Sequence, residues 1–374
     1  MWCCLVGSEM CIRDSYKPSY RRPQGHHALE MDVDLFDYEL PPDFIAQTPI
    51  NPRDAARLLD LTNGGIKDRF IQELPFILEP GDLLVANNTR VIPTKLQGQC
   101  ASKRITVNLH KKVSSSIWFA FARPAKRVTQ GDLIMFHDSV VAKVLEKNRG
   151  ELLLEFELSD KDLMGFLEQR GSMPLPPYIK RDDPKSNVAD LKDYQSIFAQ
   201  HEGAVAAPTA SLHFTDRLVA SLKKNNIDIA YLTLRVGAGT FLPVKVEDTD
   251  NHDMHSEWAE LEPKAVEEIK NVKARGNKVI ALGTTSLRVL ETASIGGTLK
   301  PFTGDTDLFI TPGFKFNATD ALITNFHLPK STLIMLASAL AGRERLLNAY
   351  EHAKNENYRF FSYGDACLID HFQR

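Results

Sequence analysis

The sequence predicts a layered α/β domain with an inserted six-stranded antiparallel β-barrel. Outside the middle of the chain, strand-like segments alternate with segments of helical period, which is typical of α/β layers. In the middle, six short strand-like segments follow one another, and their charge differs from that of the rest. We therefore assign residues 31–92 and 160–374 to one discontinuous α/β domain, residues 93–159 to the barrel, and residues 1–30 to a leader outside both.

The leader is set apart by its composition. Residues 1–30 hold three of the five cysteines and have no apolar segment long enough for a signal peptide. Regular patterning begins at Met31, which we take as the start of the folded protein. The other two cysteines, Cys100 and Cys367, are isolated, and the chain has no C-x-x-C spacing. These features indicate a reducing compartment, which we take to be the cytoplasm, and no zinc site.

Each expected barrel strand is short, rich in β-branched or aromatic residues, and bounded by turn residues. The six strands span residues 94–100, 105–113, 116–124, 132–136, 140–147 and 151–158. Closing them into a barrel would remove their exposed edges. Residues 91–150 carry eleven Lys or Arg and three Asp or Glu, a charge of +8, so the net charge of −3 leaves −11 elsewhere. Such a basic module can bind a polyanion, although charge alone equally allows a solvated lysine-rich surface.

The alternation outside the barrel is clearest in the second half of the chain. We expect strands at residues 227–236, 278–283 and 321–324, and helices at residues 218–226, 263–277, 285–294 and 332–341. The last of these helices is strongly apolar, but it is half as long as the roughly 20 residues that cross a membrane. We therefore expect it to be buried, and we expect no membrane segment.

The turn Asn325–Ser331, NFHLPKS, interrupts this apolar region with polar side chains. In open α/β sheets, ligands bind beyond the carboxyl ends of strands, where this turn is expected. We predict that it lines an active-site cleft and that Ser331 caps the helix after it. Asn325, His327 and Lys330 would then be free to contact a ligand. The alternative is a structural turn in which His327 bonds a backbone carbonyl.

Two glycine turns have both a chemical and a structural interpretation. Gly283–Thr285 joins a strand to a helix, whose free N–H groups could bind an anion or could simply be capped. Gly237 and Gly239 resemble the glycine turn of a class I methyltransferase. Pro243 blocks the helix that would follow in such an enzyme, so this evidence is weak.

Two further stretches carry imidazoles. His252, His255 and Glu257 lie close together and could provide an acid and a base, although their spacing is not convincing for a metal. They could also form a loop without chemistry. The stretch EGAVAAPTASLHF is made of small apolar residues that would let a planar ligand approach the backbone, and His213 stands at its end. Tight packing is the alternative here.

Eight stretches stand in one order along the chain: PGDLLVANNTRVIPTKL, MPLPPYIKR, GAVAAPTASLHFT, VGAGTFLPVKVED, MHSEWAEL, VIALGTTSLRVLE, DALITNFHLPKSTLIML and YRFFSYGDA. With them the chain resembles the S-adenosylmethionine:tRNA ribosyltransferase-isomerase family of queuosine biosynthesis, from about residue 34 to residue 368. The resemblance implies an α/β domain with an inserted six-stranded barrel. It also implies transfer and isomerisation of the ribosyl group of S-adenosylmethionine onto 7-aminomethyl-7-deazaguanine at the tRNA wobble position. The product would be epoxyqueuosine-tRNA, with release of adenine and methionine.

The implied reaction needs a base near the ribose 5′ carbon, which the sulfonium acidifies, and a donor for the departing adenine. It implies no metal and no cofactor, because S-adenosylmethionine is consumed as a substrate. We expect a monomer that binds tRNA. The candidates for catalysis are His213, His255, Glu257, His327 and Asp365. The candidates for substrate binding are Arg90, Thr209, Arg235, Gly237, Gly239, Thr284, Thr285, Asn325 and Lys330. The candidates for tRNA binding are Lys103, Arg104, Lys111, Lys112, Arg123, Lys126 and Arg127.

Two departures from the family pattern bear on activity. Arg235 stands where the family usually has a histidine, and Ser211 stands where it usually has a glycine. If the missing imidazole is catalytic, the protein is impaired or uses a neighbouring group. Two alternatives therefore stay open, namely a class I S-adenosylmethionine-dependent RNA methyltransferase and a catalytically impaired RNA-binding homologue.

Overall fold

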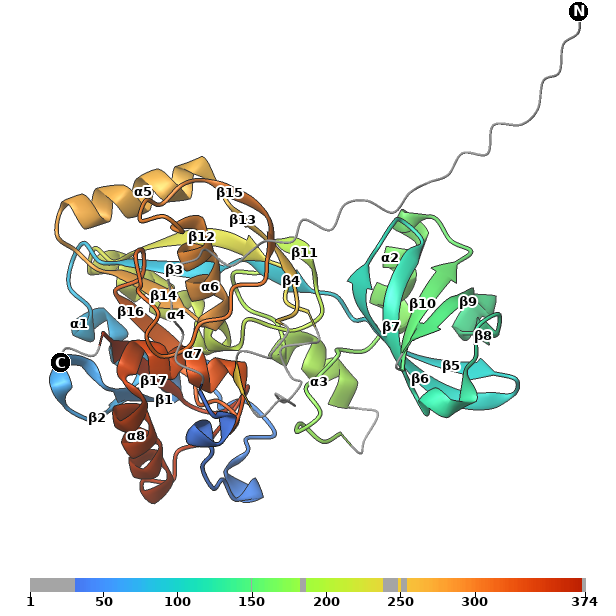
Figure 1. Ribbon diagram of the computed structural model, residues 1–374, viewed down its shortest axis with the longest axis horizontal. Coiled ribbons are helices and arrows are strands. Elements are labelled where there is room, and N and C mark those ends of the chain that lie inside the picture. The colour runs from blue at the N-terminus through green and yellow to red at the C-terminus, as the bar shows by residue number, and fades with distance from the viewer. Residues whose placement is uncertain (1–30, 149, 182–185, 238–247, 250–253, 372–374) are drawn as a thin grey trace, which may run out of the picture.

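The structure is a computed structural model, and it describes residues 31–148, 150–181, 186–237, 248–249 and 254–371. Figure 1 shows a larger α/β body on the left and a β-barrel on the right. The chain passes into the barrel after β4 (Thr89–Val91) and returns after α2 (Asp160–Arg170). The predicted fold class, an α/β domain with an inserted barrel, is confirmed.

The larger body is built on one nine-stranded sheet in the order β15, β13, β12, β3, β14, β16, β17, β1 and β2. The bounds of its strands are β1 Arg57–Asp60, β2 Lys67–Phe70, β3 Leu83–Asn87, β12 Asp228–Leu234, β13 Glu257–Leu261, β14 Val279–Leu282, β15 Phe302–Thr306, β16 Ala321–Asn325 and β17 Ala366–Asp370. Strands β12, β3, β14 and β16 are parallel, so their carboxyl ends meet at one edge of the sheet. In α/β proteins, that edge is where ligands bind.

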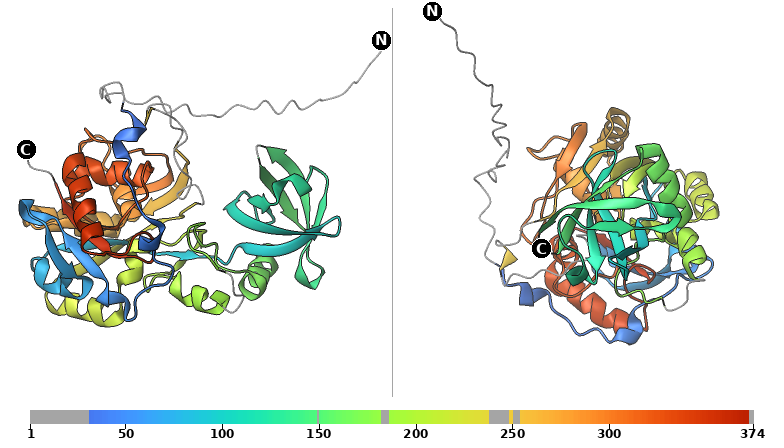
Figure 2. Two further views of the ribbon diagram at one scale, coloured as in Figure 1. Left: turned by 90° about the horizontal axis from the view of Figure 1, so that it is seen from below. Right: turned by 90° about the vertical axis from the view of Figure 1, so that its right-hand side faces the viewer.

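Helices cover both faces of this sheet (Figures 1 and 2). Strand β14 shows why, because successive side chains point to opposite faces. Val279 and Ala281 pack into one apolar cluster, and Ile280 and Leu282 pack into another. The first cluster takes in helices α5 Pro263–Ala274, α6 Thr284–Ala293, α7 Thr332–Ala341 and α8 Arg343–Asn355, and the second takes in α1 Leu74–Ile77 and α4 Asp216–Lys224.

The expected elements of this half of the chain are present. Helix α7 has the predicted bounds, and the predicted cap is confirmed, since Oγ of Ser331 accepts a hydrogen bond from the backbone N–H of Ile334. Between the barrel and β12 lie α3 (Ser186–Asp193), β11 (His201–Ala204), which pairs with β4, and a 3-10 turn at Thr209–His213. No helix among the described residues is long and apolar enough to cross a membrane.

The barrel closes in the order β10, β7, β6, β5, β8 and β9, so all six predicted strands are confirmed. Their bounds are β5 Lys95–Cys100, β6 Lys103–Lys112, β7 Ile117–Arg123, β8 Leu133–Met135, β9 Val141–Asn148 and β10 Glu151–Phe156. One packing detail differs from our assignment, which placed residues from 160 onward in the α/β domain. Leu163, Phe166 and Leu167 of α2 pack into the apolar cluster of the barrel strands, so this helix packs on the barrel.

Candidate active site

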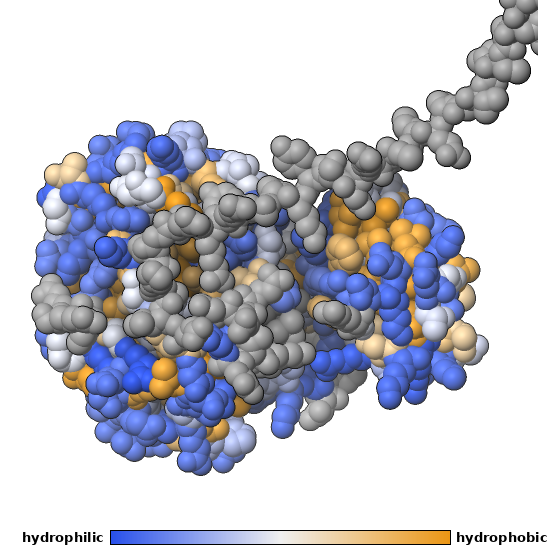
Figure 3. Space-filling view, in the orientation of Figure 1, coloured by the Kyte–Doolittle hydropathy of each residue, from blue (hydrophilic) through white to orange (hydrophobic). Residues whose placement is uncertain are grey.

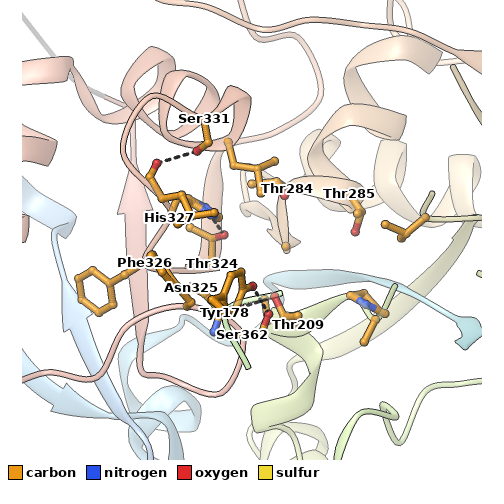
Figure 4. Close-up of a pocket in the computed structure, with 18 residues that line it drawn as sticks. Tyr178, Thr209, Thr284, Thr285, Thr324, Asn325, Phe326, His327, Ser331 and Ser362 are labelled. Carbon is orange, nitrogen blue, oxygen red and sulfur yellow. Dashed lines mark hydrogen bonds between the residues drawn. The ribbon is translucent and has the colours of Figure 1, made fainter. Parts of the chain in front are cut away.

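A pocket lies at the carboxyl ends of β12, β14 and β16 (Figure 4). Its free volume of about 60 Å³ would hold several ordered water molecules, so it can admit part of a ligand. The lining residues are Tyr178, Ala207, Pro208, Thr209, Ala210, Val236, Gly283, Thr284, Thr285, Thr324, Asn325, Phe326, His327, Leu328, Ser331, Leu333, Phe361 and Ser362. None of these is an aspartate, glutamate, lysine or arginine. The turn after β16 thus supplies much of a lining that combines apolar residues with uncharged polar ones.

Asn325, the last residue of β16, is held in one orientation by its partners. Oγ1 of Thr209 donates a hydrogen bond to its Oδ1 at 2.8 Å. Its Nδ2 lies 3.1 Å from Nε2 of His213 and 3.4 Å from the carbonyl oxygen of Asp365. Because an amide nitrogen only donates, Nε2 of His213 is the acceptor, and this network assigns the imidazole proton to Nδ1. Asn325 therefore lines the pocket, and His213 lies behind it and orients it.

His327 lines the pocket directly, and its position is fixed through its backbone. Its N–H donates to the hydroxyl of Tyr350 at 3.0 Å, and its carbonyl accepts a hydrogen bond from the hydroxyl of Tyr38. Its Nε2 lies 2.9 Å from Oγ1 of Thr324 (Figure 4). The side chain thus pairs with a hydroxyl rather than with the backbone carbonyl of the structural alternative.

The two imidazoles are uncharged at neutral pH. Burial lowers the pKa of His327 to about 3. Burial, together with the charges of Arg359 and Arg53, lowers the pKa of His213 to about 3. Each ring therefore keeps one nitrogen lone pair and one N–H at pH 7, so it can accept and donate hydrogen bonds at once.

Hydroxyl groups supply the rest of the polar lining. Gly283 follows β14 with a φ of +90°, a conformation that favours glycine, and helix α6 starts at the next residue. Thr284 and Thr285 open this helix at the pocket, and Oγ1 of Thr285 is buried without a hydrogen-bond partner among the described residues. On the opposite side, the hydroxyls of Tyr178 and Ser362 lie 2.7 Å apart. A ligand with hydroxyl or amine groups could bind these oxygens.

Both carboxylate oxygens of Glu257 make contacts that hold structural elements together. Glu257 begins β13, and its Oε1 accepts a hydrogen bond from the N–H of Gly237 at 2.7 Å. Its other oxygen pairs with the guanidinium of Arg288 on α6, and both side chains are only 5% exposed. Neither Glu257 nor Gly237 lines the pocket. This buried pair fixes the end of β12 against α6, next to Val236.

The side chains of Asp365 and Lys330 also form hydrogen bonds or ion pairs within the protein. Asp365 accepts hydrogen bonds from the N–H groups of Arg57 and Arg359, at 2.9 and 2.8 Å. Burial raises its pKa, although both of these bonds oppose that shift. Lys330, which we expected to contact a ligand, lies outside the lining and pairs with Asp34 and Asp37 at 2.8 and 3.0 Å. These two acids stand almost 300 residues earlier in the chain, so local pattern gave no sign of the contact.

The remaining candidates of the α/β domain that the structure describes do not line the pocket. Arg90 is half exposed and pairs with Glu168 and Glu202. Arg235 is exposed and stacks on Trp258, with its guanidinium carbon 4.2 Å from the ring centroid. His255 is exposed, and Gly239 lies outside the described residues. All seven barrel candidates for tRNA binding are exposed, namely Lys103, Arg104, Lys111, Lys112, Arg123, Lys126 and Arg127.

No group of three or more His, Cys, Asp or Glu among the described residues is arranged to hold a metal ion. His252, one of the residues considered for a metal, lies outside them. The described lining of the pocket offers hydroxyls, one amide and the imidazole of His327, and His213 contacts that amide.

Comparison with known proteins places this arrangement in a family. Residues 33–369 match the family described as queuosine biosynthesis protein. The chain belongs to this queuosine biosynthesis family. The S-adenosylmethionine:tRNA ribosyltransferase-isomerases of Rhodospirillum rubrum and Rhizorhabdus wittichii are 50% and 51% identical to it, over 91% of this chain and 99% of each relative.

A solved structure of the queuosine biosynthesis family agrees with the fold. The crystal structure of an S-adenosylmethionine tRNA ribosyltransferase from Thermotoga maritima matches with a TM-score of 0.51 and 34% identity. The match covers 89% of this chain and 99% of that one. The family resemblance read from the eight sequence stretches is thereby confirmed.

Sequence reasoning did not single out several lining residues of this family member, among them Tyr178, Thr324, Phe361 and Ser362. All four stand inside the stretches that carried the resemblance, yet none has an unusual local pattern. Tyr178 and Ser362 are 184 residues apart, and only the fold brings their hydroxyls together.

Proposed function

We propose that this chain transfers and isomerises the ribosyl group of S-adenosylmethionine onto 7-aminomethyl-7-deazaguanine at the wobble position of tRNA. Adenine and methionine would leave, and S-adenosylmethionine would be a substrate rather than a cofactor. Membership of the queuosine biosynthesis family supports this proposal, and its relatives carry the corresponding name. The observation that carries it in the structure is the uncharged pocket at the carboxyl ends of three parallel strands, which holds Thr209, Asn325 and His327.

The pocket suits a cationic sulfonium substrate. Among the residues that the structure describes, no lysine or arginine lines it and would repel the cation. The rings of Tyr178 and Phe361 lie with centroids 4.9 Å apart at its edge, and their faces can attract a cation or stack on adenine. The hydroxyls of Thr284 and Thr285 lie across from them and can bind the ribose or the amino-acid part of the substrate.

We assign the proton-accepting role to His327. Among the described residues of the lining, it alone carries an imidazole, and at neutral pH this ring is unprotonated. A base must remove a proton from the ribose 5′ carbon, leaving its electron pair on carbon beside the sulfonium. His213 would act through Asn325, as a positioning residue, because Asn325 stands between it and the pocket. His255, Glu257 and Asp365 have exposed or structural positions, so we assign the reacting centre to none of them.

On the tRNA side, the exposed cations of the barrel provide a surface for the phosphate backbone. We further propose that the protein works as a monomer in the cytoplasm, as a tRNA-modifying enzyme needs only access to tRNA and S-adenosylmethionine.

The test is to incubate the protein with S-adenosylmethionine and precursor tRNA and to separate the products by chromatography. We expect adenine and methionine in equal amounts, and only when tRNA is present. S-adenosylhomocysteine would instead indicate the methyltransferase alternative, and tRNA binding without either product would indicate the impaired homologue.

A further inference from the structure

The outer face of the barrel carries a column of three aromatic rings. His110 of β6 lies between Phe119 and Phe121 of β7. Its ring centroid is 4.4 Å from that of Phe121, with 15° between the planes, and 6.3 Å from that of Phe119, with 25°. The pairing of β6 with β7 is irregular between Leu109 and Lys111, so a bulge places the imidazole between the two phenyl rings.

The barrel core does not require these rings. Leu109 and Ala120, their neighbours along the strands, point inward and are fully buried in the core. Phe119 and Phe121 point outward and stay partly exposed. Figure 3 shows apolar residues gathered on this side of the barrel surface. Aromatic side chains that are stacked in order on a surface, and are not part of a core, indicate a binding surface.

The charge around the column fits a polyanion. The hairpin Lys103–Arg123 holds five Lys or Arg and no Asp or Glu. Arg104, Lys111 and Arg123 are exposed on the same two strands as the rings. Acidic groups reach this hairpin from neighbouring elements: Glu151 of β10 lies 2.9 Å from Nε2 of His110, and Asp160 of α2 pairs with Lys112.

The middle ring of the column is also uncharged at neutral pH, as base stacking favours. Burial, with the charges of His255 and Lys111, lowers the pKa of His110 to about 4, so its ring is an uncharged aromatic at pH 7.

We propose that the column of Phe119, His110 and Phe121 is a stacking surface for unpaired nucleobases of the tRNA loop, with the flanking cations contacting its phosphates. This inference rests on the proposed function, which supplies the RNA. Aromatic rings bind bases through their faces without reading sequence, and a loop, unlike a duplex, can turn its bases outward. Held here, a loop would be anchored by the barrel while another of its bases enters the α/β domain.

The experiment compares two RNAs and uses fluorescence anisotropy to measure affinity. One is an anticodon stem–loop with an unmodified guanine at the wobble position, and the other is a fully paired duplex of equal length. The variant Phe119→Leu/Phe121→Leu keeps apolar packing but loses both rings. We expect it to bind the stem–loop at least about 10-fold more weakly, with the duplex affinity nearly unchanged. The salt dependence should keep its slope, because stacking releases no counterions.

Three comparisons make the result decisive. Phe121→Trp should retain stem–loop affinity, since it keeps a stacking ring. Met135→Ala, on the exposed side of β8, removes a side chain that is 58% exposed and should change nothing. Arg123→Glu should reduce the salt slope by about one unit or more and weaken both RNAs. Equal melting temperatures of all variants and the wild type would show that each is folded, and for the variants other than Arg123→Glu retained duplex binding would show it independently.

The proposal is overturned if the double leucine variant binds the stem–loop like the wild type, or if it loses stem–loop and duplex affinity equally. It is also overturned if sedimentation shows that the variant changes oligomeric state, because the face would then bind a second copy of the chain. The binding assay uses RNA that cannot react, so a failure here is separate from a failure to release adenine and methionine, which would count against the proposed function.

Discussion

At the scale of single residues, the turn Asn325–Ser331 provides several of the polar side chains that line the pocket. We predict that His327→Gln lowers turnover by roughly 10²-fold or more, since it removes an acid–base group that lines the pocket. Its melting temperature should be close to that of the wild type, because an amide can still bond Oγ1 of Thr324. Steady-state kinetics and thermal unfolding on the same preparation test this. Unchanged turnover would show that the turn has no catalytic role and only connects a strand to a helix.

The same two imidazoles predict a dependence of stability on pH. The pKa of His213 and of His327 is about 3 in the folded protein, against about 6.5 when unfolded, so unfolding takes up protons at acidic pH. The stability that the protein has with both imidazoles buried and neutral is complete above about pH 6.5 and is lost as the pH falls toward 3. Between pH 7 and pH 5 each histidine should lower the free energy of unfolding by up to about 2 kcal/mol.

Urea unfolding at pH 7 and pH 5 measures this loss. His110, whose pKa is also lowered, contributes with the same sign, so the double variant His213→Gln/His327→Gln must be compared with the wild type. We expect the variant to lose clearly less stability on acidification. An identical loss in both proteins would show that the two rings are not buried in their neutral form.

At the scale of elements, the buried pair of Glu257 and Arg288 ties β13 and the end of β12 to α6. Glu257→Ala would leave an uncompensated guanidinium and would remove the carboxylate that accepts a hydrogen bond from the N–H of Gly237. We predict a loss of about 3–5 kcal/mol in the free energy of unfolding. The double variant Glu257→Gln/Arg288→Met, which removes both charges, should recover much of it. A single variant as stable as the wild type would contradict the structural role given to Glu257.

Elements were predictable where local pattern decides them. The apolar run 332–341 and the capping Ser331 fix α7, and short β-branched or aromatic runs between turn residues fix the barrel strands. Contacts between distant segments were not predictable in this way. The pattern of α2 shows an apolar face but does not say that Leu163 packs on the barrel. Likewise, nothing near Lys330 indicates that Asp34 and Asp37 hold it outside the pocket.

At the scale of the whole molecule, the distribution of charge predicts that the barrel binds tRNA and that the pocket of the α/β domain binds S-adenosylmethionine. Charge reversal of Lys111, Lys112, Lys126 and Arg127 to glutamate should weaken tRNA binding and flatten its salt dependence, by about one unit of slope for each lost phosphate contact. Affinity for S-adenosylmethionine should barely change, because these residues lie on the barrel and not in the pocket. Titrations at several salt concentrations, with each ligand in turn, make the comparison. An unaltered slope would indicate that the tRNA-binding surface lies on the α/β domain and not on the barrel.

The central claim is that the pocket transfers the ribosyl group of S-adenosylmethionine and not its methyl group. The most direct measurement uses S-adenosylmethionine labelled with carbon-14 in the ribose and tritium in the methyl group, incubated with precursor tRNA. After the tRNA is precipitated, we predict that carbon-14 is found in the tRNA and that tritium remains in solution as methionine. Tritium in the tRNA, with carbon-14 left in solution as S-adenosylhomocysteine, would contradict the account.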